Sequence, residues 1–63
     1  MITVNGKQID FKGSITALLD HYNLNPQAIV VEKNGAIVHR DSFSEESVED
    51  GDMVELVRFV GGG

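Results

Sequence analysis

Two Asn-Gly pairs constrain the fold of this chain more than any other feature of its sequence. Asn5-Gly6 and Asn34-Gly35 each lie between short runs rich in β-branched and other apolar residues. This dipeptide accepts the left-handed backbone angles of a type I′ turn, whose twist matches that of two antiparallel strands. The two pairs therefore predict two β-hairpins, over residues 2–11 and 27–38.

Apolar residues in both hairpins follow the period of two that is typical of strands. In the second hairpin, Gln27 to Lys33 and Ala36 to Val38 are the expected strands. Ile29 and Val31 then share one side, and Val30 and Glu32 share the other. In the first hairpin, the residues expected to face inward are Ile2, Val4, Ile9 and Phe11.

The segment between the hairpins predicts one helix. The hydroxyl of Ser14 can cap the first turn by meeting an unpaired amide. Asn23 tolerates the left-handed conformation that ends helices, and Pro26 prevents continuation. An apolar stripe at helical spacing should cover one face of the sheet, and it consists of Ile15, Leu18, Leu19 and Tyr22.

The remainder of the chain predicts a polar loop and a final strand. Phe43 and Val48 are the apolar residues of the loop, and we expect the side chains of both to be buried in the core. In the strand Met53 to Val60, Val54 and Leu56 should face the core, with Arg58 as a candidate third member. The alternate residues Glu55, Val57 and Phe59 should face the other way. Exposed apolar groups at Val57 and Phe59 would form a docking patch, and the alternative is cover by a neighbouring strand.

Three glycines follow this strand at the C-terminus. Gly61, Gly62 and Gly63 lack Cβ atoms, so the tail should stay flexible and fit channels too narrow for side chains. The terminal carboxyl is ionised at neutral pH and can attack an activated phosphate. A frayed chain end is the alternative interpretation. We therefore expect a folded domain over residues 1–60 and a flexible tail over 61–63.

Composition excludes several function classes. A chain of 63 residues without cysteine has little room for a closed active site and no side chain that can carry sulfur or form a disulfide. Its net charge of −5 opposes binding to nucleic acid and favours a basic protein partner. Its longest apolar run, Ala28 to Val31, is too short for a membrane span, and its start does not resemble a signal peptide. We expect a cytoplasmic protein that is monomeric alone.

Side-chain chemistry is sparse. His21 and His39 have no cysteine nearby, so we expect neither to bind a metal. The loop carboxylates lack the spacing of a calcium loop and the apolar surroundings of a catalytic pair. A solvated acidic face and electrostatic steering of a basic partner are the two interpretations left open for Glu45, Glu46, Glu49, Asp50 and Asp52. We expect no bound cofactor and no catalytic side chain.

The order of these elements resembles the α+β, ubiquitin-like β-grasp fold, with a mixed sheet of two hairpins and a C-terminal strand packed on one main helix. Four further motifs are distributed over the whole chain: Val4-Asn5-Gly6, Asn34 to Arg40, Asp50 to Val57, and Val60 to Gly63. Through these motifs the chain more specifically resembles the ThiS family, the sulfur carriers of thiamin biosynthesis.

The resemblance implies that the chain is a carrier and not an enzyme. A ThiF-like adenylating enzyme would bind Glu55, Val57, Phe59 and Val60 and would use ATP to adenylate the carboxylate of Gly63. A persulfide from a cysteine desulfurase would convert that group to a thiocarboxylate. A ThiG-like thiazole synthase would accept the sulfur.

Two alternatives stay open at this point. The first is a carrier with the same chemistry for another product, such as molybdopterin or cysteine. The second is a ubiquitin-like interaction module that uses no terminal chemistry, and an independent enzyme is a distant third.

Overall fold

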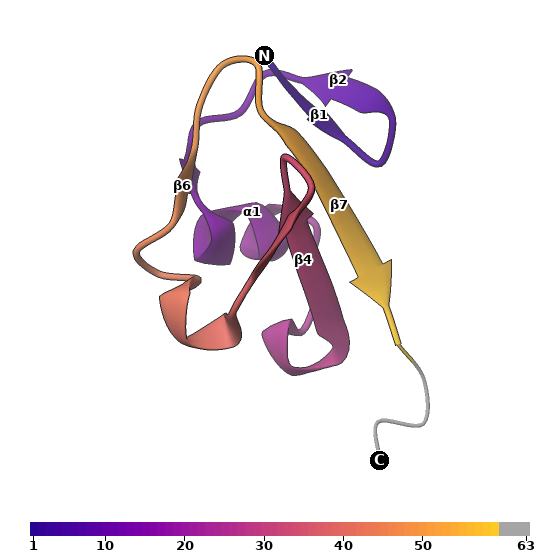
Figure 1. The fold of residues 1–63 in the computed structure, drawn as a ribbon, viewed down its shortest axis with the longest axis vertical. Coiled ribbons are helices and arrows are strands. Elements are labelled where there is room, and N and C mark those ends of the chain that lie inside the picture. The colour runs from indigo at the N-terminus through magenta and orange to yellow at the C-terminus, as the bar shows by residue number, and fades with distance from the viewer. Residues whose placement is uncertain (60–63) are drawn as a thin grey trace.

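A five-stranded sheet with one α-helix against one of its faces forms the body of the molecule (Figure 1). The computed structural model describes residues 1–59. Its elements, in chain order, are β1 (Ile2–Val4), β2 (Lys7–Ile9), β3 (Gly13–Ser14), α1 (Ile15–His21), the 3₁₀ turn η1 (Pro26–Ala28), β4 (Ile29–Lys33), β5 (Ala36–Val38), the 3₁₀ turn η2 (Arg40–Ser42), β6 (Ser47–Val48) and β7 (Met53–Arg58).

The strand order of the large sheet is β2-β1-β7-β4-β5. β1 and β7 run parallel, with Thr3 opposite Met53, whereas the other neighbours are antiparallel. The last strand therefore lies at the centre of the sheet, between the two hairpins. This mixed sheet with a single main helix is the predicted α+β architecture.

Both Asn-Gly pairs form the predicted left-handed turns. Asn5 and Gly6 have φ angles of 49° and 85°, and Asn34 and Gly35 have nearly the same angles, 53° and 86°. The side chain of Asn5 also extends the contact between β1 and β7. Its Oδ1 accepts from the Leu56 N–H at 2.7 Å, and its Nδ2 donates to the Leu56 carbonyl at 3.1 Å. This turn thus fixes the first hairpin against the central strand.

Helix α1 begins as predicted but ends one residue earlier than its apolar stripe. The Ser14 hydroxyl accepts a hydrogen bond from the Ala17 N–H at 3.1 Å and caps the first turn. Tyr22 was expected in the buried stripe, and this is wrong: it is the C-terminal cap and is 37% exposed. The reason is that Asn23, at φ 57°, already turns the chain away from the helix axis.

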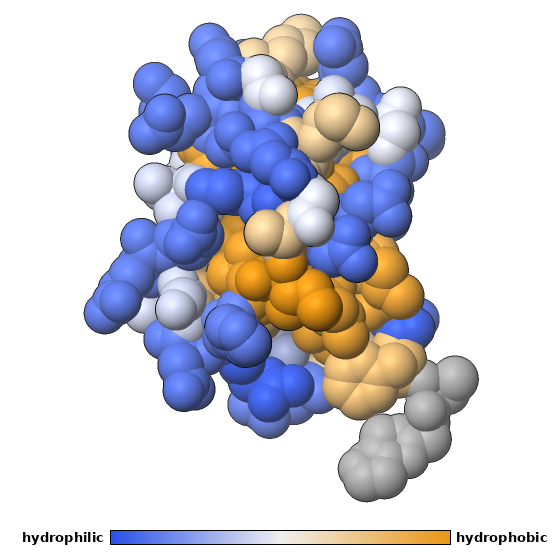
Figure 2. Space-filling view, in the orientation of Figure 1, coloured by the Kyte–Doolittle hydropathy of each residue, from blue (hydrophilic) through white to orange (hydrophobic). Residues whose placement is uncertain are grey.

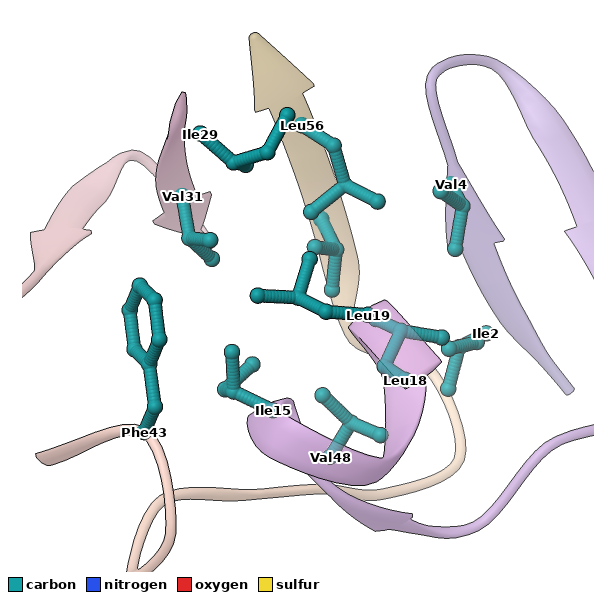
Figure 3. Close-up of a cluster of buried hydrophobic side chains, with 11 residues drawn as sticks. Ile2, Val4, Ile15, Leu18, Leu19, Ile29, Val31, Phe43, Val48 and Leu56 are labelled. Atoms are coloured by element: carbon teal, nitrogen blue, oxygen red, sulfur yellow. The ribbon is translucent and has the colours of Figure 1, made fainter. Parts of the chain in front are cut away.

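The core lies between α1 and one face of the sheet (Figure 3). Phe43 and Val48 reach into it from the loop, as predicted, and Ile9 and Phe11 pack at its margin while half-buried. Its buried members are Ile2, Val4, Ile15, Leu18, Leu19, Ile29, Val31, Phe43, Val48, Val54 and Leu56. Because segments from the whole chain meet here, burial of this cluster is the main source of stability.

Three predicted strand boundaries are wrong. The strand expected from Gln27 begins at Ile29, because Pro26–Ala28 forms a 3₁₀ turn in which the Gln27 N–H donates to the Asn25 side chain. The strand expected to reach Phe11 ends at Ile9, which pairs with Ile2 at the start of β1. The strand expected to reach Val60 ends at Arg58, and Val60 lies outside the described residues.

A small second ladder was not predicted. β3 and β6 pair antiparallel, with Gly13 opposite Val48 and Ser14 opposite Ser47. This ladder holds the long loop against the start of α1. None of the helices formed by residues 1–59 is long and apolar enough to cross a membrane.

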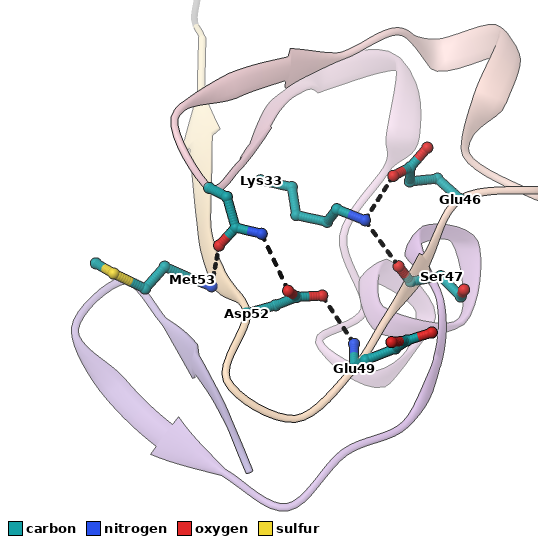
Figure 4. A network of polar contacts seen from close by, with 7 residues as sticks. Lys33, Glu46, Ser47, Glu49, Asp52 and Met53 are labelled. Carbon is teal, nitrogen blue, oxygen red and sulfur yellow. Dashed lines mark hydrogen bonds and ion pairs between the residues drawn. The ribbon is translucent and has the colours of Figure 1, made fainter.

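A polar network joins this loop to the second hairpin (Figure 4). Lys33 Nζ lies 2.6 Å from a Glu46 carboxylate oxygen and donates to the Ser47 carbonyl at 3.1 Å. The hydrogen bond to Glu46 is the main cause that raises the pKa of Lys33. Asp52 accepts bonds from the Asn34 side chain and the Glu49 N–H, at 3.0 and 2.8 Å. The network fixes the turn that leads into β7.

Candidate functional site

The sheet has one face that α1 does not cover, and we call it the open face. Residues directly opposite each other on paired strands point to the same side of a sheet, so the register assigns its members. Val57 lies opposite Val30, Glu55 opposite Glu32, and Glu32 also opposite Ile37. The open face consists of Thr3, Gln8, Val30, Glu32, Ile37, Met53, Glu55 and Val57, with Phe59 added by alternation along β7.

Several large apolar side chains of this face are exposed to solvent. Val57 is 47% exposed and Phe59 37%, and Ile37 and Met53 are each near 60%. Figure 2 shows an apolar area over β4 and the C-terminal half of β7, next to the point where the described chain ends. Of the two alternatives left open for Val57 and Phe59, exposure is confirmed, while their role in docking stays a prediction. An exposed apolar area of this kind is typical of a protein-binding surface.

The alternation along β7 produces this arrangement. Val54 and Leu56 point into the core and are 1% and 9% exposed, so Glu55 and Val57 must point outward. The Phe59 N–H donates to the Ala28 carbonyl at 3.2 Å, which continues the pairing with β4 one residue beyond the strand. The central strand therefore holds the chain firmly up to Phe59.

The predicted reacting group itself lies outside the described residues, as does the expected boundary between domain and tail. Val60, Gly61, Gly62 and Gly63 all belong to this part of the chain. The role of the Gly63 carboxylate therefore stays a prediction.

The three members of the open face on β4 and β5 were not recognised as site residues from the sequence. Val30 and Glu32 were assigned to the side of their strand opposite Ile29 and Val31, but no function was attached to that side. Ile37 was not singled out. The available signal was the tight turn at Asn34-Gly35, because a two-residue turn sets the register and hence the shared face of both strands.

The loop carboxylates mostly have structural partners. The N-terminal amine pairs with Asp50, and this hydrogen bond holds the pKa of Asp50 below its ordinary value. The bond from Asn34 is the main cause that lowers the pKa of Asp52. Together with the Lys33–Glu46 pair, these contacts join the acidic loop to the N-terminus and to the second hairpin.

The histidines do not form a site in the described part of the chain. His21 is exposed, with its ring 5.6 Å from that of Phe11 and 5.0 Å from that of Tyr22. His39 is exposed and precedes the turn η2. Residues 1–59 contain no group of three His, Cys, Asp or Glu side chains that could hold a metal ion.

Comparisons with a family profile, with curated proteins and with solved structures give consistent results. The profile of the ThiS family matches residues 2–63. The sulfur carrier protein ThiS of Bacillus subtilis is 38% identical over the full length of both chains. The crystal structure of the thiamine biosynthesis protein ThiS from Geobacter metallireducens superposes with a TM-score of 0.81, at 37% identity, and covers 98% of this chain and 97% of that one.

Two longer relatives are of a different kind. The thiazole synthase of Paramagnetospirillum magneticum is 38% identical to this chain, and that of Magnetococcus marinus is 31% identical. In both cases 98% of this chain is matched, and it spans only 20% of the relative. A segment similar to the whole of this chain thus forms part of these two larger proteins.

Proposed function

The chain belongs to the ThiS family of sulfur carriers in thiamin biosynthesis, and we propose that it carries sulfur as a thiocarboxylate on Gly63. In this role it is a co-substrate and not a catalyst. The observation that carries the proposal is the position of the three glycines, directly after a central strand whose outward side chains Val57 and Phe59 are exposed. A partner that binds this strand would find the chain terminus within reach.

The proposed chemistry begins at the terminal carboxylate. One of its oxygens attacks the α-phosphorus of ATP in an adenylating enzyme, and pyrophosphate leaves. The mixed anhydride makes the Gly63 carbonyl carbon electrophilic, because AMP is a good leaving group. The chain itself supplies no catalytic side chain for this step, so the enzyme provides the electrostatic stabilisation of the transition state.

Sulfur enters in the second step. The terminal sulfur of a cysteine persulfide attacks the Gly63 carbonyl carbon and displaces AMP, which leaves an acyl disulfide. A second thiol then cleaves the S–S bond, so the thiocarboxylate is released and a new disulfide forms. This chain has no cysteine, so the two sulfur atoms of the persulfide and the sulfur of the second thiol all come from partner proteins or small thiols.

We propose thiazole synthase as the sulfur acceptor. The two thiazole synthases that contain a segment similar to this chain support this assignment, because such an arrangement keeps a carrier domain close to its acceptor. An adenylating enzyme and a cysteine desulfurase complete the proposed set of partners. The open face, including Glu55, Val57 and Phe59, is the proposed docking surface, and Gly61 and Gly62 are the proposed spacer that enters a narrow channel.

Intact-mass measurement tests the proposal directly. The untagged chain is incubated with an adenylating enzyme of the ThiF type, ATP and sulfide. We expect one oxygen to be replaced by sulfur, and fragmentation should place the change at Gly63. The reaction is run with that enzyme and with the adenylating enzyme of the source organism, and ThiS from Bacillus subtilis is the positive control for both. If both enzymes convert the control but leave the mass of this chain unchanged, the proposal is contradicted.

A deletion of Gly62 and Gly63 provides the matched variant. Sulfur incorporation should be lost completely, because the shortened chain cannot present its carboxylate at the same position. The thermal midpoint should stay within about 2 °C of the parent, which corresponds to a free-energy change well below 1 kcal/mol. A larger loss of stability would show that the tail serves the fold.

A further inference from the structure

Charges are separated between the two faces of the sheet. The strands of the large sheet contain five charged residues, and the register divides them completely. Glu32 and Glu55 lie on the open face, whereas the three cations Lys7, Lys33 and Arg58 pair with core residues and lie on the side of α1. Within the strands, the open face is thus acidic and the other face basic.

The two carboxylates of the open face lie directly opposite each other. Glu32 on β4 pairs with Glu55 on β7 in the antiparallel register. Cβ atoms of such a pair are about 5 Å apart, and like charges at this separation destabilise a sheet. In the free protein the pair therefore opposes the folded state.

No cation of the described strands neutralises this pair. Lys33 is already bonded to Glu46 and Ser47 on the other side of the sheet. Lys7 and Arg58 line a hollow of about 400 Å³ that also includes Leu24 on the side of α1. The negative charge of Glu32 and Glu55 is therefore directed outward.

The surroundings of the pair are apolar. Ile37 lies beside Glu32 on β5, and the Val30–Val57 pair lies two residues along β4 and β7. Val57 and Ile37 are 47% and 60% exposed, so contact with another surface would remove considerable apolar area from water. A hydrated small cation would leave this apolar rim uncovered, whereas a protein surface would cover it.

From this geometry we infer that the open face receives a protein partner that places an arginine between Glu32 and Glu55, with apolar residues around it that cover Ile37, Val30 and Val57. A guanidinium group has five donors in a planar fork and can bridge two carboxylates on neighbouring strands. Removal of water from the site would strengthen these bonds. The inference rests on the proposed function, since it specifies how the adenylating enzyme recognises the carrier.

Binding measurements on neutral variants test the inference. Glu32→Gln, Glu55→Gln and the double variant are titrated with the adenylating enzyme of the source organism. Glu45→Gln is the control, because it makes the same charge change at an exposed loop position. We expect the double variant to bind this enzyme about tenfold more weakly or worse. Its loss of binding free energy should be smaller than the sum of the losses of the two single variants. Glu45→Gln should stay within about twofold of the parent.

The salt dependence of binding and the thermal stability of the free variants provide two further tests. The affinity of the parent for the enzyme should fall more steeply with added salt than the affinity of the double variant, because the double variant pairs fewer charges across the interface. The free double variant should melt at a higher temperature than the parent, because the like-charge contact is gone. Weaker binding together with higher stability is a result that general damage to the fold cannot produce.

The failure of this inference is separable from failure of the proposed function. If the double variant binds the adenylating enzyme like the parent, or if the parent does not bind it, the inference is overturned. If Gly63 is still converted to a thiocarboxylate in that case, the carrier function stands without it. If binding behaves as expected but no sulfur reaches Gly63, the docking inference stands and the terminal chemistry is wrong.

Discussion

The two faces of the central sheet have opposite roles although they alternate along the same strands. On β7, Val54 and Leu56 are buried against α1, while Glu55 and Val57 face solvent one residue away. The covered face is apolar and closed, with cations only at its margins. The open face combines exposed apolar groups with two facing carboxylates. The buried contacts that stabilise the fold thus lie on the covered face. The side chains of the open face contribute less to stability and are available for binding.

The largest expected effect comes from the covered face. Leu18→Ala removes a side chain that is fully buried between α1 and the sheet, so it should lower the free energy of unfolding by about 2–5 kcal/mol. Urea unfolding measures this loss. Ile37→Ala on the open face is the matched control and should change stability by less than about 0.5 kcal/mol. Equal losses for both variants would contradict the division between the faces.

An intermediate effect is expected from the open face, in binding and not in folding. Val57→Glu adds a charge to the proposed docking surface and should weaken binding to the adenylating enzyme about tenfold or more. Its loss of stability should stay below about 1 kcal/mol, because Val57 is half exposed. Titration calorimetry and thermal melting measure the two quantities.

The control for Val57→Glu is Thr16→Glu, which adds the same charge at an exposed position of α1. This variant should bind the enzyme like the parent. If Val57→Glu unfolds the domain, or if Thr16→Glu weakens binding as much, the open face is not the docking surface.

The smallest expected effect concerns acid stability at the turn before β7. The pKa of Asp52 is lowered from its ordinary value of 3.8, mainly by the bond from Asn34. A lowered pKa means that the folded state favours the ionised carboxylate. Its stabilisation is therefore present above about pH 4 and is lost as the pH falls through the folded pKa.

Asp52→Asn isolates this contribution. The variant should be less stable than the parent at pH 7, and the difference should shrink as the pH falls below 3.8. Urea unfolding at several pH values measures it. Asp50→Asn is the comparison, because the pKa of Asp50 is lowered by the N-terminal amine and not by Asn34. A constant difference for Asp52→Asn would show that its carboxylate charge is not involved.

The sequence was sufficient for the local elements of this protein. Asn5-Gly6 and Asn34-Gly35 allow left-handed angles with little strain, so both hairpins could be predicted with their turns. The alternation over residues 53–59 was also enough to predict that Val57 and Phe59 lie on the face opposite Val54 and Leu56. Each of these predictions depends on neighbours within a few residues, where steric preferences and periodicity decide the outcome.

Helix and strand ends were less predictable. Tyr22 has the spacing of a core residue, but the turn at Asn23 removes it from the apolar stripe. Pro26 was expected only to stop the helix, and it also begins a 3₁₀ turn that delays β4 until Ile29. Such boundaries depend on small differences between competing local hydrogen bonds, which the apolar pattern does not encode.

Only the tertiary structure decided which distant residues meet. The pairing of β4 with β7 brings Glu32 opposite Glu55, and the pairing of Gly13 with Val48 closes a ladder across a long loop. These contacts depend on where the last strand enters the sheet, and a strand can be placed at the centre only by packing against both hairpins and α1 at once. The sequence by itself determined the hairpins and the helix; packing of the common core determined the acidic pair on the open face.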